Sequence, residues 1–118
     1  MRMRPPLLIC DRFDTAVIPF PFAEIPILKR RPVVVLSGKT FNEANGSTLV
    51  AMITTSTLAV WPSDVRISDL EGAGLSVPCI LRWRMTTIPN TLIVRKLGRM
   101  GAVDRLACER GFAEMIIG

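Results

Sequence analysis

The sequence contains no histidine. Because histidine is the side chain most often used for acid–base catalysis near neutral pH, any such chemistry in this chain must rely on other groups. The three cysteines, Cys10, Cys79 and Cys108, are odd in number, widely separated and without histidine neighbours. That excludes a zinc site or a Cys–His nucleophile built from them. We expect reduced, mostly packed thiols in a cytoplasmic protein.

Long apolar runs are also missing. No segment approaches the roughly 20 residues that span a bilayer, so no transmembrane helix is predicted. The 118 residues are 49% hydrophobic and 21% charged, enough for a single domain over residues 1–118 with residues 1–12 as a loose arm. The formal net charge of +5 indicates a polyanionic or acidic partner, although such a charge can also serve solubility alone.

Short β-branched segments punctuated by turn residues dominate the chain. A polar loop is expected from Ser37 through Ser47, and an amphipathic helix over Val103–Met115, within which Gly111 costs about 1 kcal/mol relative to alanine. Six short strands with one closing helix favour a mainly β (α+β) fold, a small barrel. The expected strands are Thr15–Pro19, Val33–Leu36, Leu49–Ile53, Asp64–Ile67, Val77–Arg84 and Leu92–Leu97.

Three adjacent cations, Lys29, Arg30 and Arg31, stand directly before Pro32 and the apolar run Val33–Leu36. Lysine and arginine lose hydration when buried, so such a triplet belongs on a surface or facing an anion. Pro32 disfavours helical backbone at Arg31 and is expected to begin the strand, since it donates no backbone hydrogen bond. The pattern predicts an arginine presented rigidly at a strand edge.

The next strand along the chain ends in the hydroxyl cluster Thr54, Thr55 and Ser56. In a hairpin, the start of the first strand lies beside the end of the second, which places Arg31 near these hydroxyls. A guanidinium beside hydroxyl groups can clamp phosphate oxygens from two directions. The alternative is a solvated arginine and a Thr/Ser loop that satisfies its own backbone.

Several segments, in order and at compatible spacing, resemble the MazF/PemK family of toxin–antitoxin ribonucleases. The resemblance runs from about Asp14 to the C-terminal helix, although the family's usual Gly-Asp start is Phe13-Asp14 here. It implies an SH3-like small barrel of the MazF/PemK/CcdB type, usually a homodimer. The segments that carry it are Val17–Phe22, Lys29–Ser37, Val50–Ser56, Trp61–Val65 and Leu92–Arg99.

The resemblance further implies metal-independent, sequence-specific cleavage of single-stranded RNA, often messenger RNA, without a cofactor. Arg31 and Thr54 correspond to the catalytic pair. Because RNA carries its own nucleophile, the 2′-hydroxyl, Arg31 would neutralise charge near the leaving 5′-oxygen and Thr54 would bond a non-bridging oxygen. The candidate RNA-binding residues are Lys29, Arg30, Phe20, Phe22, Thr55, Ser56, Arg82 and Arg84.

Other interpretations of these residues stay open. Of Phe20 and Phe22, one is favoured as a core residue. Trp61 and Trp83 either pack in the protein or form platforms on which bases stack. The cations would be explained equally well as solvated residues on an exposed strand face. Arg82 and Arg84 alternate with Trp83 and are expected to share a strand face, while a basic tail of Arg95, Lys96 and Arg99 would extend the groove.

An apolar loop beside these cations suits docking of an amphipathic acidic peptide, such as an antitoxin tail; its candidate residues are Ile25, Ile27 and Leu28. The alternative functions of the same barrel are a CcdB-like inhibitor of DNA gyrase and a non-catalytic binding module. No paired carboxylates at metal-binding spacing are present, so no metal site is predicted.

Overall fold

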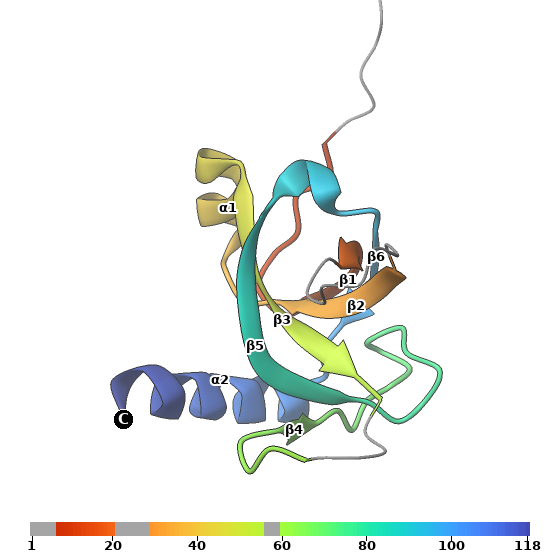
Figure 1. Ribbon diagram of the computed structural model, residues 1–118, viewed down its shortest axis with the longest axis vertical. Helices are drawn as coiled ribbons and strands as arrows, with labels where there is room; N and C mark the ends of the chain where they lie inside the picture. The colour runs from red at the N-terminus through yellow and green to blue at the C-terminus, as the bar shows by residue number, and fades with distance from the viewer. Residues whose placement is uncertain (1–6, 21–28, 56–59) are drawn as a thin grey trace, which may run out of the picture.

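The computed structural model describes residues 7–20, 29–55 and 60–118, and its dominant feature is one curled antiparallel sheet (Figure 1). The strand order is β4-β5-β3-β2-β1-β6. The helix α2 lies across one end of the curl, and the short helix α1 lies toward the other end (Figure 1). The elements are β1 (Asp14–Phe20), β2 (Lys29–Val35), α1 (Lys39–Asn45), β3 (Ser47–Thr54), β4 (Val65–Arg66), β5 (Ile80–Pro89), the 3₁₀ turn η1 (Asn90–Leu92), β6 (Arg95–Arg99) and α2 (Ala102–Ile117).

The predicted mainly β fold with a C-terminal helix is confirmed, and each predicted strand has a counterpart. The start of β2 was predicted wrongly, because this strand begins at Lys29 and Pro32 lies inside it. The ladder between β2 and β3 covers only Val33–Val35. Pro32 therefore lies beyond that ladder, where its missing N–H costs no bond to β3.

The polar loop predicted from Ser37 through Ser47 is in fact mostly helix α1. The N-cap residue Gly38, just before the helix, provides no side-chain cap, so the sequence lacks the usual start signal. Tertiary bonds hold the helix instead: the fully buried Asn42 amide donates to Cys10 O at 3.0 Å and to Ser37 O at 3.1 Å. Gly46, in the left-handed conformation, ends the helix.

Strand β5 bends sharply around the core (Figure 1). Its register with β3 jumps from Ala51 opposite Met85 to Met52 opposite Arg82, which leaves Trp83 and Arg84 as a bulge. Bulges increase strand twist and bend the sheet. The ladder is therefore interrupted here, while Trp83 is buried and its neighbours Arg82 and Arg84 are not.

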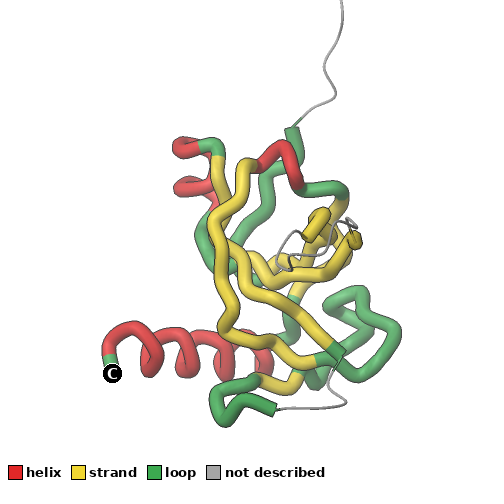
Figure 2. Tube along the Cα trace, viewed as in Figure 1, coloured by secondary structure: helices red, strands yellow, loops and turns green. Residues whose placement is uncertain are grey.

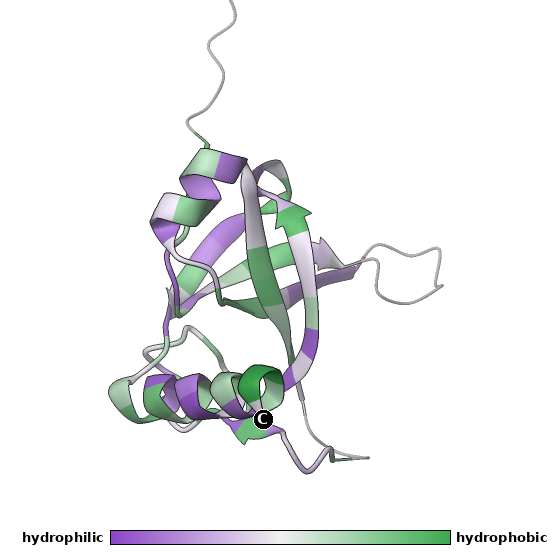
Figure 3. Ribbon diagram, turned by 90° about the vertical axis from the view of Figure 1, so that its left-hand side faces the viewer, coloured by the Kyte–Doolittle hydropathy of each residue, from purple (hydrophilic) through white to green (hydrophobic). Residues whose placement is uncertain are grey.

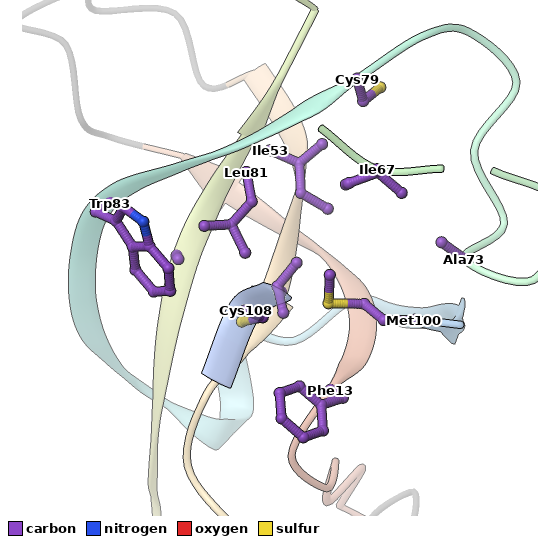
Figure 4. Close-up of a cluster of buried hydrophobic side chains, with 11 residues drawn as sticks. Phe13, Ile53, Ile67, Ala73, Cys79, Leu81, Trp83, Met100 and Cys108 are labelled. Carbon is purple, nitrogen blue, oxygen red and sulfur yellow. The ribbon is translucent and has the colours of Figure 1, made fainter. Parts of the chain in front are cut away.

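Trp83 belongs to the core, which decides one of the open alternatives (Figure 4). Its indole Nε1 donates to Ser63 O at 2.9 Å, and its ring centroid lies 6.0 Å from that of Phe112 on α2. On the same helix Cys108 is buried whereas Leu106 is exposed, so the apolar side chains of α2 do not all face the core. Figure 3 accordingly shows apolar and polar residues mixed along this helix. All three cysteines are buried, as expected.

Gly111 allows α2 to approach Trp83. A Cβ atom at this position would lie 2.8 Å from Trp83 Cζ2, and the indole is held by its bond to Ser63. We expect Gly111→Ala to lower the free energy of unfolding by about 1–2 kcal/mol, because overpacking outweighs the gain in helix propensity. Urea unfolding measures this, with Ala113→Gly on the same helix as the propensity control, expected to cost about 1 kcal/mol. A more stable Gly111→Ala protein would contradict the packing.

Phe13 stands where the family's usual glycine would be, and it is a non-glycine residue with positive φ, at 72°. This left-handed conformation is uncommon for a bulky side chain. The ring is buried in the core and lies 4.7 Å beneath the Arg12 guanidinium. Packing of the ring thus offsets the backbone strain that glycine would avoid.

Asp104 ties the first turn of α2 to the segment after β4. The buried carboxylate accepts bonds from Ser68 N, Ser68 Oγ and Asp69 N at 2.7–3.0 Å. Burial opposes ionisation, but these hydrogen bonds outweigh it, so the pKa of Asp104 lies below its ordinary value. The carboxylate therefore contributes stability above about pH 4, and this contribution is lost as the pH falls through the folded-state pKa.

We accordingly expect Asp104→Asn to lower the free energy of unfolding by about 1–3 kcal/mol at pH 7. The difference in the free energy of unfolding between wild type and variant should decrease as the pH falls from 6 toward 3. Denaturant unfolding across this pH range checks the result. A difference that does not change with pH would show that the charge on Asp104 does not contribute to stability.

The segment after β4 completes the curl on its open side (Figure 2). Arg99 N on β6 donates to Gly72 O at 2.9 Å, and the buried Thr15 Oγ1 on β1 donates to Ala73 O at 2.6 Å. No helix among the described residues is long and apolar enough to cross a membrane.

Candidate functional site

A cavity of about 480 Å³ lies where β2 begins and β3 ends. Both residues of the predicted pair, Arg31 and Thr54, line it. Apolar residues from β1, β2, β3 and β6 line other parts of the cavity, and the loop before β5 provides a further wall. The remaining lining residues are Val17, Lys29, Arg30, Pro32, Ile53, Thr55, Gly74, Leu75, Ser76, Val77, Cys79, Arg95 and Leu97.

Strand register explains why Arg31 and Thr54 meet. Between β2 and β3, Val33 pairs with Met52 and Val34 with Ala51. Arg31 and Thr54 each lie two residues beyond the end of this ladder, where β2 enters the sheet and β3 leaves it. Because the two strands are antiparallel, these two ends lie at the same edge of the sheet, and both residues line the same cavity. The proximity predicted from the hairpin is thus present in the structure.

Four cations line the cavity: Lys29, Arg30 and Arg31 from β2 and Arg95 from β6. Val17 on β1 pairs with Pro32 of β2 on one side and with Arg95 of β6 on the other. The cations of β2 and the cation of β6 therefore lie on either side of β1. Within residues 7–20, 29–55 and 60–118, the four ion pairs involve other cations, namely Arg12, Arg82, Lys96 and Arg99. Among the described residues, no carboxylate neutralises the cations of the cavity, and this positive surface favours binding of an anion.

Hydroxyl groups complement these cations. Thr54 Oγ1 lies 3.5 Å from Thr55 O, at the outer limit of a hydrogen bond, so its hydroxyl can turn toward a ligand. Cys79 is not a nucleophile here, because burial raises the pKa of its thiol, which contacts Val77 O at 3.1 Å. None of the described residues lining the cavity is a carboxylate. Such a set of groups can bind and stabilise a phosphate but supplies no ordinary general base.

Arg82 and Arg84 do not join this cavity. The Arg82 guanidinium bonds Asp64 through two nitrogens, at 3.1 Å and 2.9 Å, and lies 5.0 Å over the exposed ring of Trp61. Its hydrogen bond holds the pKa of Asp64 below the ordinary value. Arg84 is exposed within the β5 bulge. RNA contact by these two residues stays a prediction, for a surface separate from the cavity.

The three residues of the basic tail, Arg95, Lys96 and Arg99, do not share one environment in the structure. Arg95 faces the cavity, whereas Lys96 and Arg99 bond the buried Asp14 carboxylate at 3.2 Å and 3.3 Å. Phe20 ends β1 opposite Lys29. Five of the candidate residues lie outside the described part of the chain: Phe22, Ser56, Ile25, Ile27 and Leu28.

The wall formed by residues 74–77 was missed by sequence reasoning. Nothing local in the sequence shows that this loop approaches β6. The approach depends on contacts between residues more than 20 positions apart, such as Arg99 with Gly72. The paired glycines Gly74 and Gly98 were the one usable signal, because close backbone contact often requires glycine.

Comparison with known proteins now adds to this geometry. Residues 11–116 match the model of the family described as PemK-like, MazF-like toxins of type II toxin–antitoxin systems. The chain belongs to this family. The match covers every strand of the sheet and all of α2 except its last residue. It supports the resemblance inferred from the motifs over the CcdB-like alternative. No curated protein matches the chain.

Solved structures similar to this PemK/MazF-like toxin confirm its fold. MazF from Deinococcus radiodurans aligns with a TM-score of 0.73 at 18% identity, covering 94% of this chain and 99% of the other. The MazF-mt6 toxin of Mycobacterium tuberculosis aligns at 0.69 with 22% identity, covering 86% and 93%. An endoribonuclease from a mycobacterial species, solved with its cognate antitoxin, aligns at 0.69 with 11% identity, covering 90% and 91%.

Metal-binding residues do not cluster in the described part of this toxin. Apart from residues 1–6, 21–28 and 56–59, which the structure does not describe, no group of three or more histidine, cysteine, aspartate or glutamate residues is placed to share an ion. The polar side-chain groups that line the cavity are guanidinium, ammonium, hydroxyl and thiol groups.

Proposed function

We propose that this toxin is an endoribonuclease that cleaves single-stranded RNA in the cavity at the start of β2. The observation that carries the proposal is the meeting of Arg31 and Thr54 in one cavity with three further cations. A guanidinium and a hydroxyl can bond different oxygens of the same phosphate. The mycobacterial endoribonuclease that shares the fold supports the assignment.

RNA supplies the nucleophile in this mechanism. The 2′-oxygen attacks the adjacent phosphorus, a P–O2′ bond forms, and the P–O5′ bond breaks to leave a 2′,3′-cyclic phosphate and a 5′-hydroxyl. The 2′-hydroxyl proton passes to solvent, and the leaving 5′-oxygen takes a proton from solvent, because no described cavity residue is an ordinary base. Atoms and charge balance without a further reactant.

Arg31 stabilises the pentacoordinate phosphate in this reaction. Its planar fork donates two hydrogen bonds to phosphate oxygens and offsets the negative charge that develops on them. Thr54 donates from the neighbouring strand to a non-bridging oxygen. Both residues stand on strands of the sheet, so their backbones are positioned before RNA binds and their side chains have only to turn toward the phosphate.

Lys29, Arg30 and Arg95 bind the phosphates that flank the cleaved bond. The three residues extend the positive surface across β2 and β6, strands separated by β1 and hence by about 10 Å. Such contacts position the strand but do not read its sequence. Phe20, Phe22, Thr55 and Ser56 remain candidate contacts with the RNA.

A protein antitoxin is the second partner of the cavity. The chain belongs to a family of toxins from toxin–antitoxin systems, and two structural relatives were solved with an antitoxin, from a mycobacterial species and from Deinococcus radiodurans. An acidic, amphipathic segment would satisfy the cavity cations and exclude RNA by occupying their site. Ile25, Ile27 and Leu28 are its candidate apolar contacts.

The activity is tested with purified protein in excess EDTA. We expect discrete fragments from long single-stranded RNAs and none from DNA of the same sequence, because only RNA carries the 2′-hydroxyl. Cleavage that requires added magnesium, or equal cleavage of the DNA, would contradict the proposed reaction. A panel of several unrelated RNAs ensures that the cleavage sequence is represented.

A further inference from the structure

The walls of the cavity differ in chemistry. Residues from β2 and β6 provide the cations, whereas the loop Gly74–Val77 is neutral. Phosphate favours the first kind of wall. A neutral wall with polar and apolar groups is better matched to a nucleobase, whose edges form hydrogen bonds and whose faces are apolar.

Hydrogen bonds fix the neutral wall to the body of the protein. Besides the bonds from Thr15 to Ala73 and from Arg99 to Gly72, Leu75 N donates to Leu70 O at 2.8 Å. Beyond the other end of the loop, Ile67 N donates to Cys79 O at 3.1 Å. The loop is thus anchored at both ends, and a side chain on it has a defined position relative to Arg31.

Close backbone packing adds to this rigidity. Gly74 has φ of 71°, and a Cβ atom there would lie 2.4 Å from Leu97 O on β6. No other residue type fits this position without moving the loop. The neutral wall therefore lies directly against β6, the strand that provides Arg95.

Two side chains of the wall are available to a ligand. Ser76 is exposed and presents a hydroxyl that can donate and accept, and Val77 is 47% exposed. Leu75 is partly buried and packs against the core cluster. Ser76 therefore matches a base edge, and Val77 matches a base face.

We propose that the loop Gly74–Val77 is the base-selecting wall of the cavity and that Ser76 is a specificity-determining residue. The inference rests on the proposed ribonuclease function. With the phosphates held by the cations, a base adjoining the cleaved bond turns toward the loop, where the Ser76 hydroxyl bonds its edge and Val77 contacts its face. This rigid wall selects the base because a mismatched edge leaves hydrogen-bonding groups unpaired.

The test is a cleavage profile on an RNA library with randomised sequence, read by sequencing the new 5′-hydroxyl ends. Ser76→Ala is expected to lose about tenfold discrimination at one position next to the cut, with the total rate changed less. Ser76→Thr, which keeps the hydroxyl, should retain the preference. Ser63→Ala, an exposed serine outside the cavity, is the matched control and should give the wild-type profile.

Arg95→Ala is expected to change the overall rate of cleavage and not its sequence preference. Loss of a phosphate contact should lower cleavage at all sequences about equally and reduce its salt dependence. If the profile of Ser76→Ala equals that of wild type, or if Ser76→Ala only lowers all sites uniformly, the base-selecting role is wrong. If wild type cleaves nothing in the library, the ribonuclease proposal itself fails, so the two failures are distinguishable.

Discussion

Replacing Arg31 by alanine is expected to lower the rate of RNA cleavage about 10³-fold, the cost typical of removing one preorganised donor to a transition state. Arg31 lines the cavity beside Thr54, and its fork is the group best placed to stabilise the pentacoordinate phosphate. The side chain is only partly buried and forms no described ion pair, so the fold should survive. Single-turnover cleavage of one mapped RNA measures the effect.

Arg110→Ala is the matched control, because it removes the same charge from an exposed position on α2. It should cleave at nearly the wild-type rate. Arg31→Lys keeps the charge but loses the fork, and we expect it to fall between wild type and alanine. Equal rates for Arg31→Ala and Arg110→Ala would show that the catalytic group lies elsewhere.

Gly98→Ala is expected to lower the free energy of unfolding by about 3 kcal/mol, at the upper end of overpacking effects. A Cβ atom at Gly98 would lie 2.3 Å from Gly72 O and 2.9 Å from the Ala73 carbonyl carbon, both backbone atoms. Neither can turn aside as a flexible side chain would, because Gly72 O also accepts the bond from Arg99 N. The loop must move off β6.

Chemical denaturation of Gly98→Ala, with Gly38→Ala alongside, measures this cost. A Cβ atom at Gly38 would meet nothing within 4 Å, so its replacement should cost less than about 1 kcal/mol. If the two variants are equally stable, the loop does not lie against β6 as described. Movement of the loop should also widen the cavity, so Gly98→Ala is expected to lose cleavage specificity.

The central pair of the site could be predicted because it depends on local topology. Arg31 and Thr54 lie on consecutive antiparallel strands, so the start of one and the end of the other meet at the same edge of the sheet. The role of Arg95 could not be fixed in the same way. It reaches the cavity because β6 pairs with β1, a contact between residues nearly 80 positions apart.

The errors in the fold also have physical causes. Helix α1 was missed because buried bonds of Asn42 hold it, and neither a cap nor an apolar stripe marks it in the sequence. The bulge at Trp83 and Arg84 in β5 was not predicted either. Strand periodicity assumes an unbroken ladder, and a bulge is visible only once the partner strand is known.

Chemical analysis of the two ends created by cleavage is the most direct test of the account. Wild-type protein is incubated with a short RNA containing one mapped site, in excess EDTA, and the products are weighed by mass spectrometry. A 2′,3′-cyclic phosphate, with a 5′-hydroxyl on the other fragment, is the predicted result, because the cavity supplies cations and hydroxyls around a nucleophile that belongs to the RNA. A 3′-hydroxyl with a 5′-phosphate would mean that water attacks the phosphate, and would contradict the mechanism.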